Sequence, residues 1–191
     1  MVGIGVSVAL TKTGHFEVMP NYLRPKVTGS TVFFTVALAR RGDDLLVREV
    51  DRLRGAVRAT MQERPFTIVA WVVLPDHLHA VWTLPEGDRD FSTRWGAIKA
   101  RFLMDMDAGR LRSSHMARRE KGIWQRRFWE HHIRDEADFD AHVRYCWGNP
   151  VKQGLVARAV DWPHSSIHRD IRLGQVEPEW AGGSEEGEFG E

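Results

Sequence analysis

Alternating apolar and polar stretches in the middle of the chain predict strands separated by helices. Residues 31–38 and 66–74 are rich in β-branched and aromatic side chains, which is typical of strands. A third such run, residues 77–84, follows the turn Pro75-Asp76, and this spacing favours an antiparallel hairpin. Because residues 66–74 are apolar on both faces, we expect that strand to be central in its sheet.

Between the strands, hydrophobic residues recur at spacings of three and four, which predicts helices. We expect helices over residues 43–62, 91–106 and 135–147, the last of them ending or kinking near Gly148. A fourth strand is expected within residues 123–133. The order β-α-β-β-α-β-α predicts an α+β fold. Its first six elements form a ferredoxin-like split βαβ sandwich with an antiparallel sheet, and an extra C-terminal helix comes after them.

The two ends of the chain differ from this middle. The length of 191 residues, with 42% hydrophobic and 28% charged residues, suits one globular domain. Residues 176–191 hold six glutamates and no lysine or arginine, which predicts a disordered acidic tail. Residues 1–18 fit poorly with the rest of the chain, so we expect a disordered extension there and consider Met19 a candidate start. The domain is therefore expected over residues 19–175.

Several classes of protein are excluded by composition. The single cysteine, Cys146, rules out a disulfide framework and a zinc cluster built on cysteines. No apolar run approaches the ~20 residues of a membrane-spanning helix. The apolar start, residues 1–10, lacks the basic residues that open a signal peptide. We therefore expect a cytoplasmic protein in a reducing compartment.

The net charge of +1 hides a strongly basic region. Residues 110–134 carry eight basic and two acidic side chains, and such a local excess favours a polyanion as partner. A solvated surface rich in arginine is the alternative.

Two histidines offer candidate chemistry on the third predicted strand. Residues i and i+2 of a strand project from the same face, so the imidazoles of His77 and His79 point the same way while Leu78 points to the other face. Neighbouring ring nitrogens can share one divalent ion. Two surface histidines on a half-exposed strand are the plain alternative.

A tyrosine and an asparagine are placed together in the last predicted helix. Asn149 follows Tyr145 by four residues, so the two share a face if the helix continues. Pro150 biases the backbone of Asn149 away from the helical region, so this shared face is an expectation that the structure must test. A tyrosine hydroxyl can serve as a covalent nucleophile. In the alternative interpretation, Tyr145 packs in the core and Asn149 ends the helix.

The segments that carry these residues resemble a known family. His77-Leu78-His79 is similar to the His-hydrophobic-His signature of the HUH endonucleases, and residues 145–156 resemble the signature of the IS200-like single-tyrosine transposases. The domesticated branch of these enzymes, the REP-associated tyrosine transposases, is the most similar. Supporting matches run from residue 20 to about residue 173. They include Trp71 to His79, Trp124 to His131 and Asp161 to Ser166.

The resemblance implies a site and a reaction. His77, His79 and Asn149 would hold Mg²⁺ or Mn²⁺, and Tyr145 would attack single-stranded DNA beside a hairpin, forming a 5′-phosphotyrosine and a free 3′-hydroxyl. The partner would be hairpin DNA of the REP type, and the enzyme would act as a monomer or a homodimer near the nucleoid. Trp124, Phe128 and Trp129 are candidate base-stacking residues. The DNA-binding candidates are Arg24, Lys26, Arg118, Arg119, Arg126, Arg127, Arg134 and Lys152.

Two rival functions remain open at this point. A hairpin-binding regulator derived from a transposase would keep the basic surface without catalysis. A zinc hydrolase would need a third ligand and a general base beside His77 and His79, and Asp76 is the only close carboxylate. His131 and His132 are expected to contact DNA or to lie on the surface, and residues 135–140 are expected to start a helix. Cys146 is expected to pack, without a catalytic role.

Overall fold

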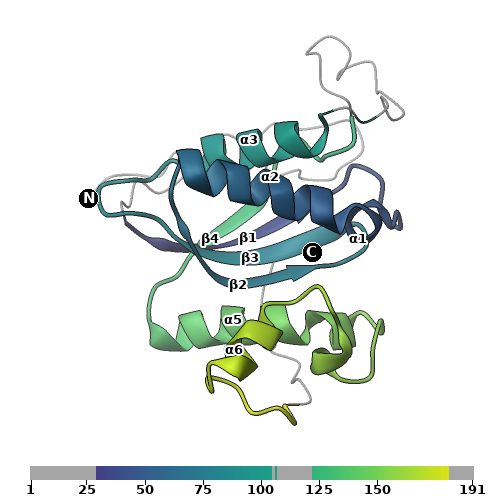
Figure 1. Ribbon diagram of the computed structural model, residues 1–191. Coiled ribbons are helices and arrows are strands. Elements are labelled where there is room, and N and C mark those ends of the chain that lie inside the picture. Colours follow the sequence, from purple (N-terminus) through teal and green to yellow (C-terminus); the bar gives the residue numbers. More distant parts are fainter. Residues whose placement is uncertain (1–28, 105, 107–121, 181–191) are drawn as a thin grey trace, which may run out of the picture.

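The fold is built on a four-stranded antiparallel sheet (Figure 1). The computed structural model describes residues 29–104, 106 and 122–180. Its strands are β1 (Thr31–Ala37), β2 (Thr67–Val73), β3 (His77–Thr83) and β4 (Trp129–His132), in the spatial order β2-β3-β1-β4. This order is that of a ferredoxin-like sandwich, so the predicted fold class is confirmed.

Helices cover both faces of the sheet (Figure 1). On one side lie α2 (Val50–Glu63) and α3 (Phe91–Phe102), and on the other lie α5 (Glu136–Lys152) and the short α6 (Ile167–Arg172). Successive strand residues face opposite sides, so Val32, Phe34 and Val36 of β1 join the core under α2 and α3. Phe33 joins a second core under α5. The single sheet therefore carries two separate hydrophobic cores.

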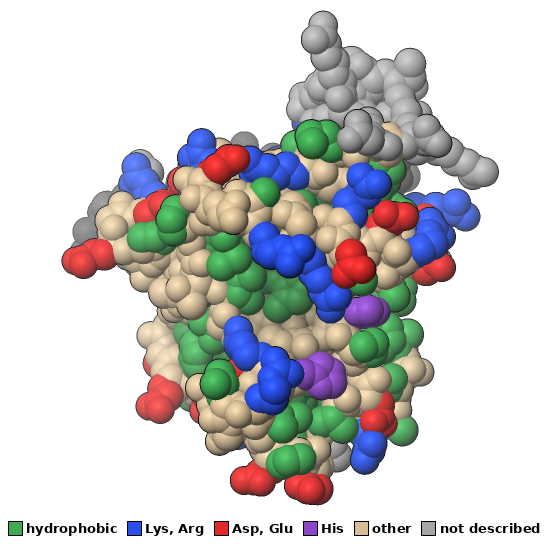
Figure 2. Space-filling model, viewed as in Figure 1, with side chains coloured by type: hydrophobic (Ala, Val, Ile, Leu, Met, Phe, Trp, Pro, Cys, Tyr) green, Lys and Arg blue, Asp and Glu red, His purple; other side chains and the backbone are tan. Residues whose placement is uncertain are grey.

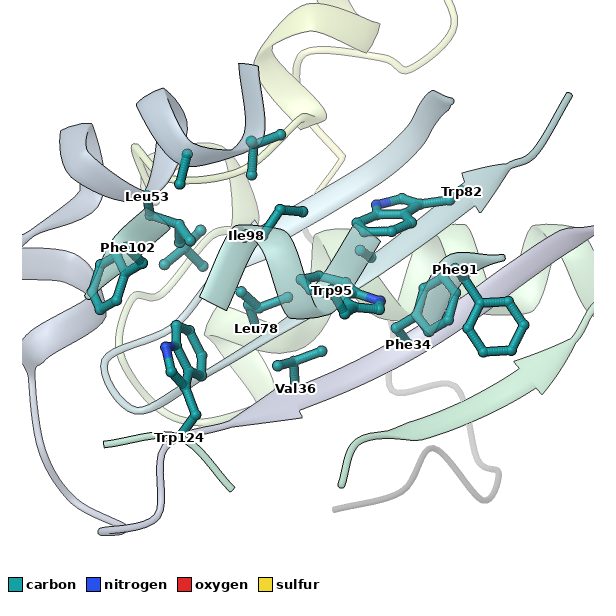
Figure 3. Packing of buried hydrophobic residues seen from close by; sticks show 14 of the residues in the cluster. Phe34, Val36, Leu53, Leu78, Trp82, Phe91, Trp95, Ile98, Phe102 and Trp124 are labelled. Atoms are coloured by element: carbon teal, nitrogen blue, oxygen red, sulfur yellow. The ribbon is translucent and has the colours of Figure 1, made fainter. Parts of the chain in front are cut away.

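Large aromatic side chains fill the core under α2 and α3 (Figure 3). Trp82 of β3 and Trp95 of α3 are fully buried and stack with ring centroids 4.2 Å apart. Phe34 packs at a tilt against Trp82 at 5.0 Å, and such tilted or offset contacts add to the burial energy. This core packs against one face of β3 and β1. The histidine pair lies on the opposite face of β3.

The first predicted helix is interrupted near its start. The short α1 (Leu45–Arg48) precedes α2, and Glu49 between them leaves helical geometry with φ −107° and ψ 27°. The backbone N–H of Leu46 donates to the carbonyl of Pro75 at 3.1 Å, and the Leu46 side chain is buried. This contact ties α1 to the β2–β3 turn, a constraint that helical periodicity alone does not predict.

The expectation that residues 66–74 form a central strand is wrong, because β2 lies at the edge of the sheet. Its outer edge is covered by the chain that leads into α6. The N–H of Val73 donates to the carbonyl of His164 at 2.9 Å, and the N–H of Ser166 donates to the carbonyl of Trp71 at 2.8 Å. The guanidinium of Arg169 donates to the Ile68 and Val69 carbonyls. These bonds protect the edge and explain the strand's apolar sequence.

Helix α5 is longer than the sequence predicted. It begins after Asp135, whose carboxylate accepts from the N–H of Asp138 at 2.9 Å, and it continues through Gly148 and Pro150 to Lys152. The helix is held past the proline by tertiary packing, since Gly148, Asn149 and Pro150 are all buried. The expected end near Trp147 is therefore wrong. The predicted shared face of Tyr145 and Asn149 is formed.

The predicted ends of the domain fall largely outside the described residues. This applies to the extension over residues 1–18, to the candidate start at Met19, and to all of the acidic tail beyond Trp180. Among the described helices, none is long and apolar enough to cross a membrane.

Candidate active site

The two histidines of β3 lie side by side under α5. His77 pairs with Ala37 and His79 pairs with Thr35 across the β1–β3 ladder. Both side chains are buried, at 3% and 0% exposure, and their ring centroids are 5.1 Å apart with the rings nearly perpendicular. The expectation of a shared face is confirmed, and the alternative of two half-exposed surface histidines is wrong.

A carboxylate orients His77. The Nδ1 atom of His77 lies 2.6 Å from Oδ1 of Asp76, and the second carboxylate oxygen accepts from the N–H of Gly42 at 2.6 Å. Burial by itself would raise the pKa of Asp76, but the hydrogen bonds from His77 and Gly42 outweigh it and lower that pKa below its usual value. The carboxylate is therefore ionised and accepts the Nδ1 proton of His77. A neutral imidazole held in this way presents a lone pair at Nε2.

The orientation of His79 is fixed by two partners. Its Nδ1 atom lies 2.9 Å from the hydroxyl of Thr35, and its Nε2 atom lies 3.2 Å from the amide nitrogen of Asn149. With the Asn149 amide in this orientation its nitrogen donates to Nε2, and a neutral His79 then carries its proton on Nδ1. In their neutral forms, the two histidines would thus share one tautomer. Each has an Nε2 lone pair and a proton-bearing Nδ1 held by an oxygen, which is the arrangement found behind metal-bound histidines.

Tyr145 stands on the same face of α5 as Asn149. Its ring centroid lies 5.1 Å from that of His79 and 5.9 Å from that of Phe33, in edge-on contacts. The ammonium of Lys152 lies 3.4 Å from the Tyr145 hydroxyl and 4.8 Å from the ring centroid. Tyr145 is only 2% exposed, so a substrate phosphate reaches its hydroxyl only if neighbouring groups move aside. Lys152, exposed at the end of α5, is one such neighbour.

The donor set suits a divalent cation. The Asn149 amide of α5 meets Nε2 of His79, and the His77 ring lies beside His79 on β3. Rotating the Asn149 amide by half a turn directs its oxygen where its nitrogen now lies. Three such ligands would leave further coordination positions for water or phosphate oxygens. Asp76 takes part as the orienting group behind His77, a role that the sequence alone did not indicate.

A cavity of about 280 Å³ opens next to Thr35, the partner of His79, although neither histidine lines it. It is lined by Thr35, which binds His79, and by Arg41, whose guanidinium lies 3.4 Å from the Asp76 carboxylate. The exposed Arg127 adds a second guanidinium, and Phe128 and Trp129 supply aromatic walls. Sequence reasoning selected Arg127 and the aromatic residues but missed Gln125 beside them, and it missed Arg41 because that residue lies far from them in the chain.

The expectation for Trp124 is wrong. This residue was expected among the base-stacking residues, but it is only 6% exposed and packs against Phe102 with ring centroids 5.3 Å apart. It belongs to the core under α2 and α3. Phe128 and Trp129 are partly buried and remain at the cavity.

The predicted DNA-binding residues divide into two groups. Arg126, Arg127, Arg134 and Lys152 are exposed, which suits a contact with DNA. Arg24, Lys26, Arg118 and Arg119 lie outside the described residues.

The remaining candidates have other surroundings. His131 is half-buried, and its Nε2 lies 2.8 Å from the carboxylate of Asp138; a contact with DNA stays a prediction. Cys146 is fully buried in the core under α5, where burial raises the pKa of its thiol, and its predicted packing role is confirmed.

Figure 2 shows a second, larger hollow on the surface. This cavity of about 360 Å³ lies between α2 and the chain around residues 164–169, and its walls are mostly apolar. Arg54, Arg58 and Arg169 are among its lining residues. It shares no lining residue with the cavity of about 280 Å³, so it is a separate feature of the surface.

Known proteins resemble this chain over most of its length. A REP-associated tyrosine transposase of Escherichia coli (strain K12) is 46% identical over 164 residues, covering 86% of this chain and 92% of the relative. A protein of Haemophilus influenzae described as a putative REP-associated tyrosine transposase is 39% identical, covering 86% of this chain and 94% of the relative. No family model matches.

A solved structure agrees with these relatives. It is described as a REP-associated tyrosine transposase bound to a REP hairpin. It is 45% identical to this chain, superposes with a TM-score of 0.80, and covers 91% of this chain and 98% of its own. The fold, the element order and the level of identity agree, and the chain belongs to the family of REP-associated tyrosine transposases.

Proposed function

We propose that this protein is a metal-dependent endonuclease and strand transferase that cleaves single-stranded DNA beside REP-like hairpins. The observation that carries the proposal is the convergence of Tyr145, Asn149 and His79 under α5. A tyrosine, an amide and an imidazole meet there from segments about 70 residues apart, beside a basic and aromatic cavity. The relatives from Escherichia coli and Haemophilus influenzae are described as transposases, and the solved structure holds a REP hairpin, which supports the choice of substrate.

The reaction forms one bond and breaks another at the same phosphorus. The Tyr145 oxygen attacks the scissile phosphate, the bond to the 3′ oxygen breaks, and the DNA stays on the protein as a 5′-phosphotyrosine. The phenol loses its proton to solvent, and the departing 3′ oxygen takes one up. A second DNA end can then attack the phosphotyrosine, which gives strand transfer without a nucleotide cofactor. Lys152 stabilises the charge that develops on the Tyr145 oxygen.

His77, His79 and Asn149 would hold Mg²⁺ or Mn²⁺. When bound, such an ion polarises the phosphate and orients the bond to be broken. Asp76 and Thr35 keep both imidazoles in the tautomer with a lone pair at Nε2. A zinc hydrolase based on the same histidines is less well supported, because Asp76 is engaged with His77 and Gly42.

The cavity at Thr35 is proposed to receive the nucleotide next to the scissile phosphate. Arg41 and Arg127 would neutralise phosphates, while Phe128 and Trp129 offer surfaces for a base. Arg126 and Arg134 would contact the hairpin backbone, which positions DNA without reading its sequence. We propose that the reaction takes place in the cytoplasm, where chromosomal DNA is found, with the protein as a monomer or homodimer.

Incubation with Mn²⁺ and labelled single-stranded hairpin oligonucleotides tests this function on a denaturing gel. The expected product is a band shifted by the mass of the protein, present with the natural chain and with Tyr22→Phe but absent with Tyr145→Phe. His77→Ala is expected to lose the adduct while keeping hairpin binding on a native gel. Specific binding with no adduct under any condition would instead support a regulator that has lost catalysis.

A further inference from the structure

A second group of metal-binding side chains lies between β4 and the start of α5. His131 comes from β4, and Asp138 and His142 come from the first two turns of α5. Ligand atoms of the three residues all lie within 4.8 Å of one another. The side chains of Asp138 and His142 are 8% and 6% exposed, and that of His131 is 25% exposed. The group therefore has one open side and is otherwise enclosed.

Hydrogen bonds already hold the three residues together. Nε2 of His131 lies 2.8 and 3.0 Å from the two carboxylate oxygens of Asp138. Nδ1 of His142 lies 3.1 Å from one of these oxygens and 2.7 Å from the Asp138 carbonyl. The two imidazole rings stack with centroids 4.6 Å apart and planes at 11°. Two ring nitrogens thus converge on one carboxylate.

We propose that His131, Asp138 and His142 bind a structural Zn²⁺ ion, separate from the ion expected at His77 and His79. Two imidazoles and one carboxylate are a ligand set that zinc takes up readily, and water can complete a tetrahedral shell. Ring protons that now bridge to the carboxylate are released when the metal binds. The three side chains would need to move little to bind the ion, because their ligand atoms are already close together.

The guanidinium of Arg134 must move away before a metal ion binds. The Nε atom of Arg134 lies 3.1 Å from the Asp138 carboxylate, and its positive charge would oppose a metal ion. The side chain of Arg134 is 74% exposed, so it can turn into solvent at little cost. The N–H of the same residue also donates to the carboxylate, at 2.9 Å, and can stay as an outer contact.

A bound Zn²⁺ would fasten α5 to the sheet one turn before Tyr145. Phe33 links the two regions, because its ring centroid lies 4.7 Å from that of His142, 5.9 Å from that of Tyr145 and 5.6 Å from that of His79. Zinc would thereby fix the position of the tyrosine relative to the histidine pair. This role does not depend on the proposed DNA cleavage.

Zinc content measured by mass spectrometry on the tag-free full chain tests the proposal. The background variant is His77→Ala/His79→Ala, which removes the first site. We expect this protein to retain about one equivalent of Zn²⁺ after gel filtration. Adding His131→Gln and His142→Gln should weaken Zn²⁺ binding more than about 100-fold, whereas adding His168→Gln on α6 should leave it unchanged.

A second measurement guards against variants that fail to fold. Titrating Zn²⁺ into the metal-free background variant should raise its Tm by about 5–10 °C at a free concentration 100 times Kd. Crystals of the unmodified chain grown with Zn²⁺ should show an anomalous peak between His131 and His142. Zinc that stays bound in the fourfold variant, or no peak there, would overturn the proposal and leave the three residues as a hydrogen-bonded clamp.

Discussion

The amide nitrogen of Asn149 lies 3.2 Å from Nε2 of His79, across 70 residues of sequence. This contact joins the tyrosine helix to the histidine strand and, together with the Thr35 hydroxyl at Nδ1, holds the His79 ring from both sides. Pro150 comes immediately after Asn149, and α5 nevertheless continues to Lys152. The proline therefore does not remove Asn149 from the site, because buried packing holds the helix across it.

Asp76→Asn should lower the affinity for the metal ion while leaving the fold intact. The carboxylate holds Nδ1 of His77 at 2.6 Å, and losing such an orienting group costs about 10–100-fold in metal affinity. We expect the Mn²⁺ concentration for half-maximal cleavage to rise by that factor. Asp161→Asn, which alters an exposed ion pair with Arg158, is the control. An unchanged Mn²⁺ requirement in Asp76→Asn would contradict the orienting role.

Lys152→Met should slow formation of the DNA adduct more than it weakens DNA binding. The variant keeps the length of the side chain but removes the ammonium 3.4 Å from the Tyr145 hydroxyl. Adduct formation at saturating DNA should fall by about 100-fold. The rate should also recover as pH rises, because hydroxide then takes over the formation of the tyrosine anion. Lys152→Arg should restore much of the rate. Equal losses of affinity and rate at every pH would instead indicate a simple phosphate contact.

Arg127→Ala should reduce the salt dependence of single-stranded DNA binding. The exposed guanidinium lines the cavity at Thr35, and one lost phosphate contact lowers the log–log slope by about 0.7. Arg172→Ala, an exposed position at the end of α6, should leave the slope unchanged. The slope is measured by fluorescence anisotropy over a range of salt concentrations. The same slope in both variants would exclude Arg127 from the interface.

Asp88→Asn should destabilise the fold in a pH-dependent way. The hydrogen bond from the buried Arg94, at 2.6 Å, lowers the pKa of Asp88 below its usual value. The stabilisation is therefore present above about pH 4 and is lost as pH falls through the folded-state pKa. At pH 7 we expect the free energy of unfolding to drop by about 1–3 kcal/mol.

Urea unfolding of the Asp88 variant across pH provides the check. The difference in the free energy of unfolding between wild type and Asp88→Asn should become smaller as pH falls from 4 towards 2. Asp51→Asn, in an ion pair with Arg54 where the aspartate is 92% exposed, should cost less than about 1 kcal/mol at any pH. A difference that stays constant with pH would show that the ionised carboxylate is not what stabilises Arg94.

The sequence predicted those parts of the site that depend on local periodicity. His77 and His79 had to share a face once β3 was a strand, and Tyr145 and Asn149 had to share one once α5 was continuous. The element order came from the same patterns and indicated a ferredoxin-like fold, although the expected position of β2 in the sheet was wrong. These inferences needed no knowledge of which segments meet in space.

The parts that the sequence did not predict depend on how neighbouring elements pack against one another. Nothing near Asp76 indicates that it orients His77 with help from Gly42, and nothing near His131 indicates its contact with Asp138 and His142. The apolar sequence of β2 suggested a central strand because residues 164–169, which cover its edge, are about 95 residues away. Tertiary packing likewise carried α5 past the proline.

The most direct test of the central claim is to identify the residue that carries the DNA. The chain has two tyrosines, Tyr22 and Tyr145, so digestion of the covalent adduct followed by mass spectrometry separates the candidates. Trypsin should release the peptide from Tyr145 to Lys152, and we predict a nucleotide joined through its 5′-phosphate to Tyr145. DNA linked to Tyr22, or to any residue other than Tyr145, would contradict the account.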